Sequence, residues 1–389
     1  MEMVVQVQDE EEELPLRGDI LEAVLALAPL TDLVPASRVS KPWRCMVASS
    51  PSLFNRLEPW LLLHSYTTTT HAYDSHSRTW IQTDLKPHID IEGFSTTTAA
   101  VRSSNPNLLY ALSPASLSFS FDPLHLAWHH AHGPTVWRAD PVVALVGRHI
   151  IMAGGGCDFE DDPLAVEAYD LDSCVWTPRE SMPASLKDSA ASTWLSTAVC
   201  NCMNSRRLFV TERNSGVTHT FDPVANIWLG PYDLLPPDSS IFSVAITCFD
   251  DDRLVLVGLY GEAENVEGVR VWGVNCEQIQ SNSKHMHELM GEMPLVLVEK
   301  LRSESYCVAS VKVCLAANVL YIYNPAMVGE IFTCEFVGKI LRWGSVRSPR
   351  SWMERVVVTG SEVGLREVQQ VLAAERRRFA AELTGGVSG

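Results

Sequence analysis

The feature that most constrains this chain is a short pattern that returns about every fifty residues. An aromatic residue followed by Asp stands just before five residues and a Trp, and the four clear copies place Asp at 74, 122, 170 and 222. The copies are Tyr73, Asp74 and Trp80; Phe121, Asp122 and Trp128; Tyr169, Asp170 and Trp176; and Phe221, Asp222 and Trp228. Weaker copies stand near Asn275 and at Tyr323 and Asn324. A repeat of this period predicts an array in which each copy builds one supersecondary unit.

Each copy has a simple interpretation as a β-hairpin with aromatic anchors. The aromatic residue ends one strand, Asp accepts hydrogen bonds in an Asx-turn, and Trp begins the partner strand. From residue 60 onward, short runs rich in Val, Leu, Ile, Phe, Tyr and Thr are broken by turn-forming residues, which is typical of strands. Ahead of the third hairpin, an apolar run ends in Gly154, Gly155 and Gly156, where the missing Cβ allows another backbone to approach. We therefore expect a mainly β fold.

The order of Gly154 and Gly155, an aromatic residue and Trp resembles the kelch repeat. This resemblance implies a β-propeller with one four-stranded blade per copy. Only the third copy has the double glycine, so the array is degenerate, and six copies over residues 60–360 favour six blades, with five or seven as alternatives. The first copy has room for three strands, and RVVVTG at 355–360 is a spare strand. We expect that strand to complete the first blade and to remove an exposed sheet edge.

Residues 14–55 differ from the rest because their apolar residues have helical spacing. Asp19 and Glu22 have the form of a capping box, Thr31 and Ser40 are candidate caps of a second and a third helix, and Pro35 and Pro42 interrupt these later helices. About forty residues are too few for a self-sufficient core, so apolar surface should remain and dock on something.

This all-α segment contains Leu14-Pro15, Asp19-Ile20-Leu21, Leu25, Leu30 and Leu33, and later Arg38-Val39-Ser40-Lys41 and Trp43-Arg44. The order and spacing of these residues resemble the F-box motif. The resemblance implies that it binds a Skp-type adaptor, and through it a cullin and a RING protein. The residues that it assigns to adaptor binding are Leu14, Pro15, Ile20, Leu21, Leu25 and Leu30, with Val39, Trp43 and Arg44 shared between packing and contact. The alternative is a helical cap that packs on the rest of its own chain.

Charge limits the remaining functions. Lys and Arg number 30 against 47 Asp and Glu, and the net charge of −17 argues against binding to nucleic acid or to an anionic membrane. Residues 1–13 hold six acids and are expected to be a disordered leader, with a second disordered tail at 384–389. Residues 361–383 read as a C-terminal amphipathic helix. The absence of a signal sequence or a long apolar stretch, together with ten scattered cysteines, predicts reduced thiols and a cytoplasmic or nuclear location.

Catalytic motifs are lacking, and we expect no cofactor, no metal and no active site. The sequence has no G-x-S-x-G elbow, no phosphate-binding P-loop, no H-E-x-x-H pair and no paired C-x-x-C. His125, His129, His130 and His132 flank Trp128, but adjacent strand residues point to opposite faces, which disfavours a metal site. An enzymatic alternative is a copper radical oxidase resembling galactose oxidase. A further alternative is a scaffold without a role in ubiquitin transfer.

Two acidic inserts mark one end of the expected propeller. CDFEDDP at 157–163 and YGEAENVEG at 260–268 stand between second and third strands, where loops commonly carry recognition. We hypothesise that a basic segment of a protein substrate docks there. The acidic residues concerned are Asp158, Glu160, Asp161, Asp162, Glu262 and Glu264. The alternative is that they serve solubility alone. As a whole the chain resembles a plant-type F-box/kelch-repeat protein. This resemblance implies that it is the substrate receptor of a Skp-cullin-F-box ubiquitin ligase.

Overall fold

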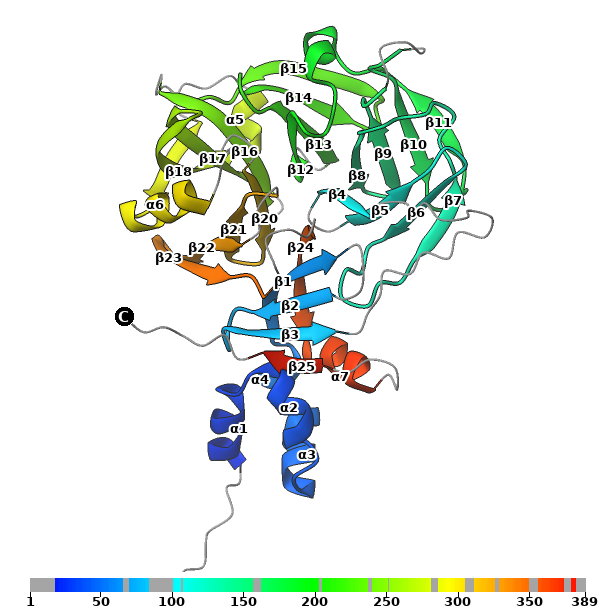
Figure 1. Ribbon diagram of the computed structural model, residues 1–389. Coiled ribbons are helices and arrows are strands. Elements are labelled where there is room, and N and C mark those ends of the chain that lie inside the picture. Colours follow the sequence, from blue (N-terminus) through cyan, green and yellow to red (C-terminus); the bar gives the residue numbers. More distant parts are fainter. Residues whose placement is uncertain are drawn as a thin grey trace, which may run out of the picture. The chain divides into compact units, whose positions relative to one another are not determined.

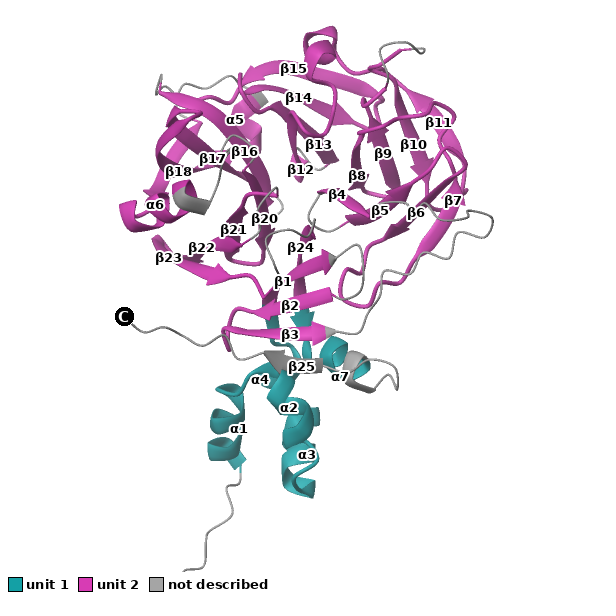
Figure 2. Ribbon diagram, in the orientation of Figure 1, with its two compact units in different colours: residues 1–58, 363–374 teal, residues 59–362, 375–389 magenta. Residues whose placement is uncertain are grey.

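The computed structural model describes residues 18–65, 70–83, 101–105, 108–156, 162–202, 205–236, 240–250, 252–280, 286–304, 311–325, 329–349, 356–373 and 379–382. The chain divides into two compact units (Figure 2). Unit 1 comprises residues 1–58 and 363–374, and unit 2 comprises residues 59–362 and 375–389. The leader expected at 1–13 and the tail expected at 384–389 lie outside the described residues.

Unit 2 is a six-bladed β-propeller (Figure 1). Within the described residues, the first sheet has five strands, in the order β24-β1-β2-β3-β25, and each of the other five sheets has four. The first sheet consists of β24 (Val356–Gly364), β1 (Leu57–Ser65), β2 (Thr70–Asp74), β3 (Thr79–Thr83) and β25 (Phe379–Glu382). Blades two and three are β4 (Arg102–Asn105), β5 (Leu108–Leu112), β6 (Ser116–Ser120) and β7 (His129–His132), then β8 (Val142–Val146), β9 (His149–Ala153), β10 (Val166–Asp170) and β11 (Trp176–Arg179).

The remaining three blades repeat this arrangement. Blades four and five are β12 (Leu195–Cys202), β13 (Ser205–Glu212), β14 (Val217–Asp222) and β15 (Ile227–Asp233), then β16 (Ile241–Phe249), β17 (Arg253–Glu262), β18 (Asn265–Asn275) and β19 (His287–Glu292). Blade six is β20 (Lys312–Ala316), β21 (Val319–Tyr323), β22 (Glu330–Val337) and β23 (Ile340–Arg347). The helical insertions are η1 (Ala184–Ser189), α5 (Cys276–Gln280) and α6 (Leu295–Glu304).

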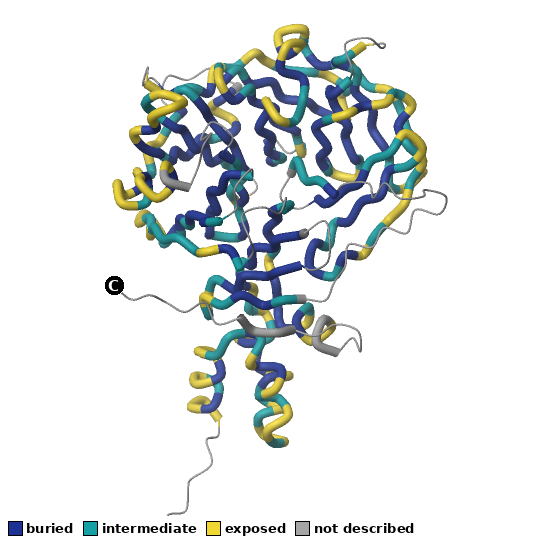
Figure 3. Tube along the Cα trace, in the orientation of Figure 1, coloured by how far each residue is buried: buried dark blue, intermediate teal, exposed yellow. Residues whose placement is uncertain are grey.

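The propeller core lies between neighbouring blades. Its buried apolar side chains form clusters that each join two successive blades, as Val142 and Ile151 of blade three do with Phe221 of blade four. Figure 3 shows this as continuous buried stretches along the strands. Because each blade covers a face of the next, no blade can bury its apolar surface alone.

The C-terminal strand completes the first blade, as the sequence predicts. β24 pairs with β1 at one edge of the first sheet. The buried ring of His64 in β1 spans three strands, because its Nδ1 lies 3.2 Å from the Thr70 hydroxyl and its Nε2 lies 2.9 Å from the hydroxyl of Thr359 in β24. The circle of six blades is therefore closed by β24, a strand from the C-terminal part of the chain.

The repeated hairpins share one turn. In each clear copy the Asp Oδ1 accepts a backbone N–H two or three residues later, which confirms the expected Asx-turns; the donors are His76, His125, Asp172 with Ser173, and Val224 with Ala225. The fourth residue after each Asp has a positive φ, and these residues are Arg78, Leu126, Cys174 and Asn226. Only Asn readily adopts this conformation, so at the other three copies the turn overrides local preference.

The repeated Trp side chains connect blades. The indole Nε1 donates to a backbone carbonyl at the end of the outer strand of the preceding blade in three copies: Trp80 to Arg347 at 2.9 Å, Trp176 to His132 at 2.8 Å, and Trp228 to Glu180 at 2.9 Å. Each of these indoles also packs against the aromatic residue of its own copy, with ring centroids 4.9 to 5.3 Å apart. The second copy differs, since Trp128 Nε1 is buried without a hydrogen-bond partner in the described residues.

The glycine pair permits the close approach expected from the sequence. Gly154 and Gly155 have φ values of +66° and +69°. A Cβ at Gly154 would lie 2.3 Å from the carbonyl oxygen of Ala190. The buried Arg138 donates to the Gly154 carbonyl at 3.1 Å and to the Glu167 carboxylate at 3.1 Å, an ion pair that sequence reasoning did not find.

Several expectations about the propeller need correction. Tyr323 and Asn324 end the second strand of blade six, not the third, because α6 adds residues before β20 and displaces the repeat. Residues 260–268 extend the β17–β18 hairpin and do not form a separate loop. A disulfide joins Cys200 to Cys248, contrary to the expectation of free thiols throughout.

Among its described residues, unit 1 consists of four short helices and one helix from the C-terminal part of the chain. They are α1 (Gly18–Ala26), α2 (Leu30–Ala36), α3 (Lys41–Ser49), α4 (Pro51–Phe54) and α7 (Leu365–Ala373). The sequence predicted three helices for this segment and missed the single turn of α4. The helix expected over 361–383 is shorter, because 361–364 belong to β24 and 379–382 form β25.

The C-terminal helix supplies the packing that the N-terminal helices lack. α7 packs against α2 and α4 and buries Leu365 and Val368. The Arg366 guanidinium lies 4.2 Å from the centroid of the Phe54 ring, a cation–π contact. The apolar surface left by the short helices, which the sequence predicted must dock on something, is thus partly covered by residues from the far end of the same chain.

Replacing His64 by Gln should reduce the loss of folding stability at acidic pH. Burial lowers the pKa of His64 to about 3, whereas the unfolded chain takes up a proton near the ordinary value of 6.5. This group therefore does not affect the free energy of unfolding above about pH 6.5. As the pH decreases below that value, the free energy of unfolding decreases, and the loss reaches about 2 kcal/mol at about pH 5. Urea denaturation of both proteins at neutral and acidic pH measures the difference, with the exposed His132→Gln as control. An equal acid slope in wild type and His64→Gln would contradict this role.

Replacing Val368 by Asp should destabilise unit 1. The side chain is fully buried on α7, and an unpaired buried carboxylate costs about 3 kcal/mol or more. Hydrogen exchange should then show faster exchange of the α2 and α4 amides. The matched control is Gln369→Asp, which places the same charge on the exposed face of the same helix. If Val368→Asp leaves the α2 amides as protected as Gln369→Asp does, α7 is not part of the core of unit 1.

Candidate functional site

Helix α1 presents two apolar faces, one buried and one exposed. Leu21 and Leu25 are 1% and 2% exposed, respectively. Ile20 and Val24 on α1 and Leu27, the first residue after its end, are 64%, 43% and 77% exposed. Their spacing of four and three residues places them in one row. Exposed apolar rows of this kind on a surface helix are typical of protein interaction sites. We call these three residues the α1 row.

The structure separates the residues that the sequence assigned to adaptor binding. Leu14 and Pro15 lie outside the described residues. Leu21, Leu25 and Leu30 are at most 2% exposed, so they belong to the core of unit 1 and not to its contact surface, which corrects that part of the prediction. Ile20 is exposed. Val24 and Leu27 were missed, although the spacing from Ile20 carried the signal.

The later residues of the predicted set are accessible to different degrees. Val39 is 65% exposed and follows α2. Trp43 is half-buried in the first turn of α3, and its backbone N–H is capped by the Ser40 hydroxyl at 3.4 Å, as the sequence predicted. Arg44 is exposed and its Nε donates to the Ser37 carbonyl at 3.4 Å. All three therefore have accessible surface, and Trp43 is also partly packed.

Polar contacts hold α1 in place against α4. The Glu22 carboxylate accepts hydrogen bonds from the hydroxyls of Ser50 and Ser52, the second at 2.6 Å. The hydrogen bond from Ser50, and then that from Ser52, lowers the pKa of Glu22 below its ordinary value. The expected capping box is thus replaced, because α1 begins at Gly18 and Glu22 binds α4 instead. Thr31 also does not cap α2, where Pro29 occupies the N-cap position.

The acidic residues assigned to substrate binding are divided between two blades. Asp158, Glu160 and Asp161 lie outside the described residues. Asp162 is exposed, but its carboxylate accepts from the Leu164 N–H at 3.0 Å and the Ser181 hydroxyl at 2.5 Å, so it stabilises its own loop. Glu262 and Glu264 are exposed at the β17–β18 turn of blade five, with blade four between them and Asp162.

Three of the four histidines near Trp128 have separate local contacts. His125 Nδ1 lies 2.6 Å from the Asp122 carboxylate, His130 Nδ1 lies 2.9 Å from the Ser118 hydroxyl, and the ring of His129 stacks on Phe119. In the part of the chain that the structure describes, no three His, Cys, Asp or Glu side chains converge as metal ligands do. No helix among the described residues has the length and apolar character needed to cross a membrane.

Comparison with known proteins identifies the family. No family model matches the chain. An F-box/kelch-repeat protein of Arabidopsis thaliana is 39% identical over 380 residues, which cover 92% of this chain and 93% of the relative. The similarity thus extends over both the helical unit and the six-bladed propeller. This chain therefore belongs to the F-box/kelch-repeat proteins.

Proposed function

We propose that this protein is the substrate receptor of a Skp-cullin-F-box ubiquitin ligase. Unit 1 binds the Skp-type adaptor, which connects it to a cullin and a RING protein, and the propeller binds the protein substrate. The observation that carries the proposal is the α1 row, together with family membership. The protein needs no active site for this role.

The α1 row has the properties of a binding anchor. Ile20, Val24 and Leu27 are large, apolar and aligned, and burying each fully would contribute about 1.5 to 3 kcal/mol. Leu21 and Leu25 on the neighbouring, buried face of α1 fix the helix to its own unit, and Glu22 holds it to α4. The row is therefore preorganised, which lowers the entropic cost of association. A groove in a helical adaptor is a suitable partner surface.

The propeller contributes a rigid recognition surface. Its loops emerge from blades that are bound to one another through the Trp hydrogen bonds. Loops on such a scaffold commonly carry specificity. Joining an adaptor-binding unit and a substrate-binding unit in one chain raises the effective concentration of substrate lysines near the ubiquitin-loaded enzyme. The role of Glu262 and Glu264 in binding a basic segment remains part of this proposal.

Replacing Ile20 and Leu27 together by Asp should weaken adaptor binding at least tenfold. The change puts two carboxylates where the proposal requires desolvated apolar contact. Titration calorimetry with a purified Skp-type adaptor measures the affinity. Val224→Asp is the control, because Val224 is 84% exposed in a propeller turn and carries the same chemical change outside unit 1.

Two results would contradict the proposal. If the wild-type protein does not bind the adaptor, the protein is a scaffold outside the ubiquitin pathway. If the Ile20 and Leu27 double variant binds as tightly as Val224→Asp, then adaptor binding does not use the α1 row. Circular dichroism of each variant establishes that the fold is retained.

A further inference from the structure

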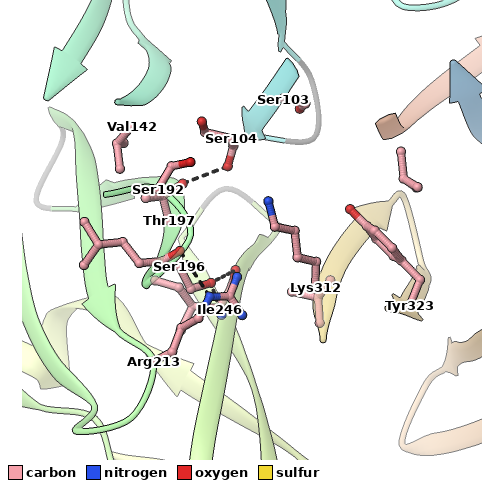
Figure 4. Close-up of a pocket in the computed structure, with 13 residues that line it drawn as sticks. Ser103, Ser104, Val142, Ser192, Ser196, Thr197, Arg213, Ile246, Lys312 and Tyr323 are labelled. Carbon is pink, nitrogen blue, oxygen red and sulfur yellow. Dashed lines mark hydrogen bonds between the residues drawn. The ribbon is translucent and has the colours of Figure 1, made fainter. Parts of the chain in front are cut away.

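The propeller has a cavity in its central channel (Figure 4). Every blade contributes to the lining, through Val358 of β24, Ser104 of β4, Val142 of β8, Thr197 of β12, Ile246 of β16 and Lys312 of β20. Val142, Thr197 and Lys312 lie at or near the starts of the first strands β8, β12 and β20. The first strand of a blade starts at the same end of the channel as the loop between its second and third strands, so the cavity lies toward that end. This is the end that the sequence analysis expected to bind a substrate.

Two cationic side chains from different blades line this cavity. Arg213 follows β13 and is 7% exposed, and Lys312 begins β20. The Arg213 guanidinium donates to the carbonyls of Leu195 at 3.3 Å and Val311 at 2.7 Å, so the residue before Lys312 binds Arg213 directly. The two positive charges are thereby held near each other in a largely enclosed place.

Burial and mutual repulsion act on both cations. Burial, and then the charge of Arg213, lowers the pKa of Lys312 to about 8, and burial lowers the pKa of Arg213 to about 10. At neutral pH both side chains still carry a proton. Neither cation forms an ion pair with a carboxylate among the described residues. Two desolvated positive charges without a counter-ion are unfavourable, so an anion at this position would stabilise the folded protein.

No carboxylate among the described residues forms an ion pair with Lys312. Asp140 acts on it electrostatically, but its oxygens are occupied elsewhere. One oxygen accepts from the Ser192 hydroxyl at 2.6 Å, and the other accepts from the Thr193 N–H at 3.0 Å and hydroxyl at 2.7 Å. Arg102 also lies 3.9 Å from the Asp140 carboxylate. The cavity therefore has an excess of positive charge.

The donors that remain available suit an oxyanion. In the described part of the chain, neither Lys312 Nζ nor the Tyr323 hydroxyl donates a hydrogen bond to the protein, and Figure 4 shows both side chains reaching into the cavity. Other hydroxyls are already engaged, as Thr197 donates to the Ser104 carbonyl at 2.9 Å. The cavity has a volume of about 40 Å³, which is enough for a few water molecules or one small tetrahedral ion.

We propose that the central channel binds a small oxyanion of the phosphate class between blades four and six. Lys312 Nζ and the Tyr323 hydroxyl bind its oxygens, and Arg213 supplies the second positive charge. The bound anion bridges the residue after the second strand of blade four and the first two strands of blade six, and so stabilises the ring. The same chemistry fits free phosphate and a phosphate group carried on an organic molecule. The site is independent of adaptor binding by unit 1.

Titration of the full-length protein with inorganic phosphate tests the site. Isothermal titration calorimetry at constant ionic strength gives the affinity, and thermal unfolding gives the linked stabilisation. Wild type should bind phosphate saturably, with a melting temperature that rises with its concentration. Lys312→Met should weaken binding at least tenfold. The control is Lys339→Met, which removes an exposed lysine from the β22–β23 turn and should leave binding unchanged.

A second variant keeps the test decisive if Lys312→Met does not fold. Tyr323→Phe removes one hydroxyl and should weaken phosphate binding several-fold. Absence of phosphate binding to the wild type at millimolar concentrations would overturn the proposal. An affinity of Lys312→Met equal to that of the wild type would also overturn it. If Lys312→Met does not fold, the same conclusion follows from an unchanged affinity of Tyr323→Phe. Phenyl phosphate distinguishes the sources: affinity equal to that of phosphate supports a phosphate monoester as the ligand, and weaker binding supports the free ion.

Discussion

The pairing of β24 with β1 is the constraint on which the rest of the structure depends. A propeller blade buries its faces only against its neighbours, so an open ring would expose two apolar faces and a sheet edge. β24 supplies the missing strand, and the Thr359 hydroxyl binds the buried ring of His64. The indole of Trp80 then reaches the Arg347 carbonyl of blade six. This is the same contact that Trp176 and Trp228 make inside the ring, so the point of closure resembles the other blade junctions.

The closing strand also links the ring to the helical unit through the chain itself. β24 ends at Gly364 and α7 begins at Leu365, so one continuous segment first completes the propeller and then packs on α2 and α4. The segment 14–55 is short of a self-sufficient core, and α7 supplies part of what it lacks. Unit 1 can therefore leave Ile20 and Val24 on α1 and the following Leu27 exposed, while Leu21 and Leu25 hold that helix in place.

Local chemistry explains which features the sequence predicted. The Asx-turn and its Trp form within nine residues, so the aromatic-Asp pattern located four hairpins and led to the blade number and the closing strand. Features that depend on tertiary structure were missed. α1 is apolar on two faces, so periodicity alone could not decide whether Ile20 or Leu21 faces solvent. Tyr323 and Asn324 match the repeat pattern but end a second strand, since α6 shifts the register of the last blade. The contact between Arg213 and Val311 joins blades four and six, which no local pattern indicates.

The central claim is that the segment 356–373 completes both units. The direct measurement is thermal unfolding and adaptor binding of a chain that ends at Pro349, compared with a chain that ends at Ala373. The account predicts that the chain ending at Ala373 unfolds cooperatively and binds the adaptor as the full-length protein does. It also predicts that the chain ending at Pro349 loses the cooperative transition of the propeller and binds the adaptor more weakly. An unchanged melting temperature and unchanged adaptor affinity in the chain ending at Pro349 would contradict it.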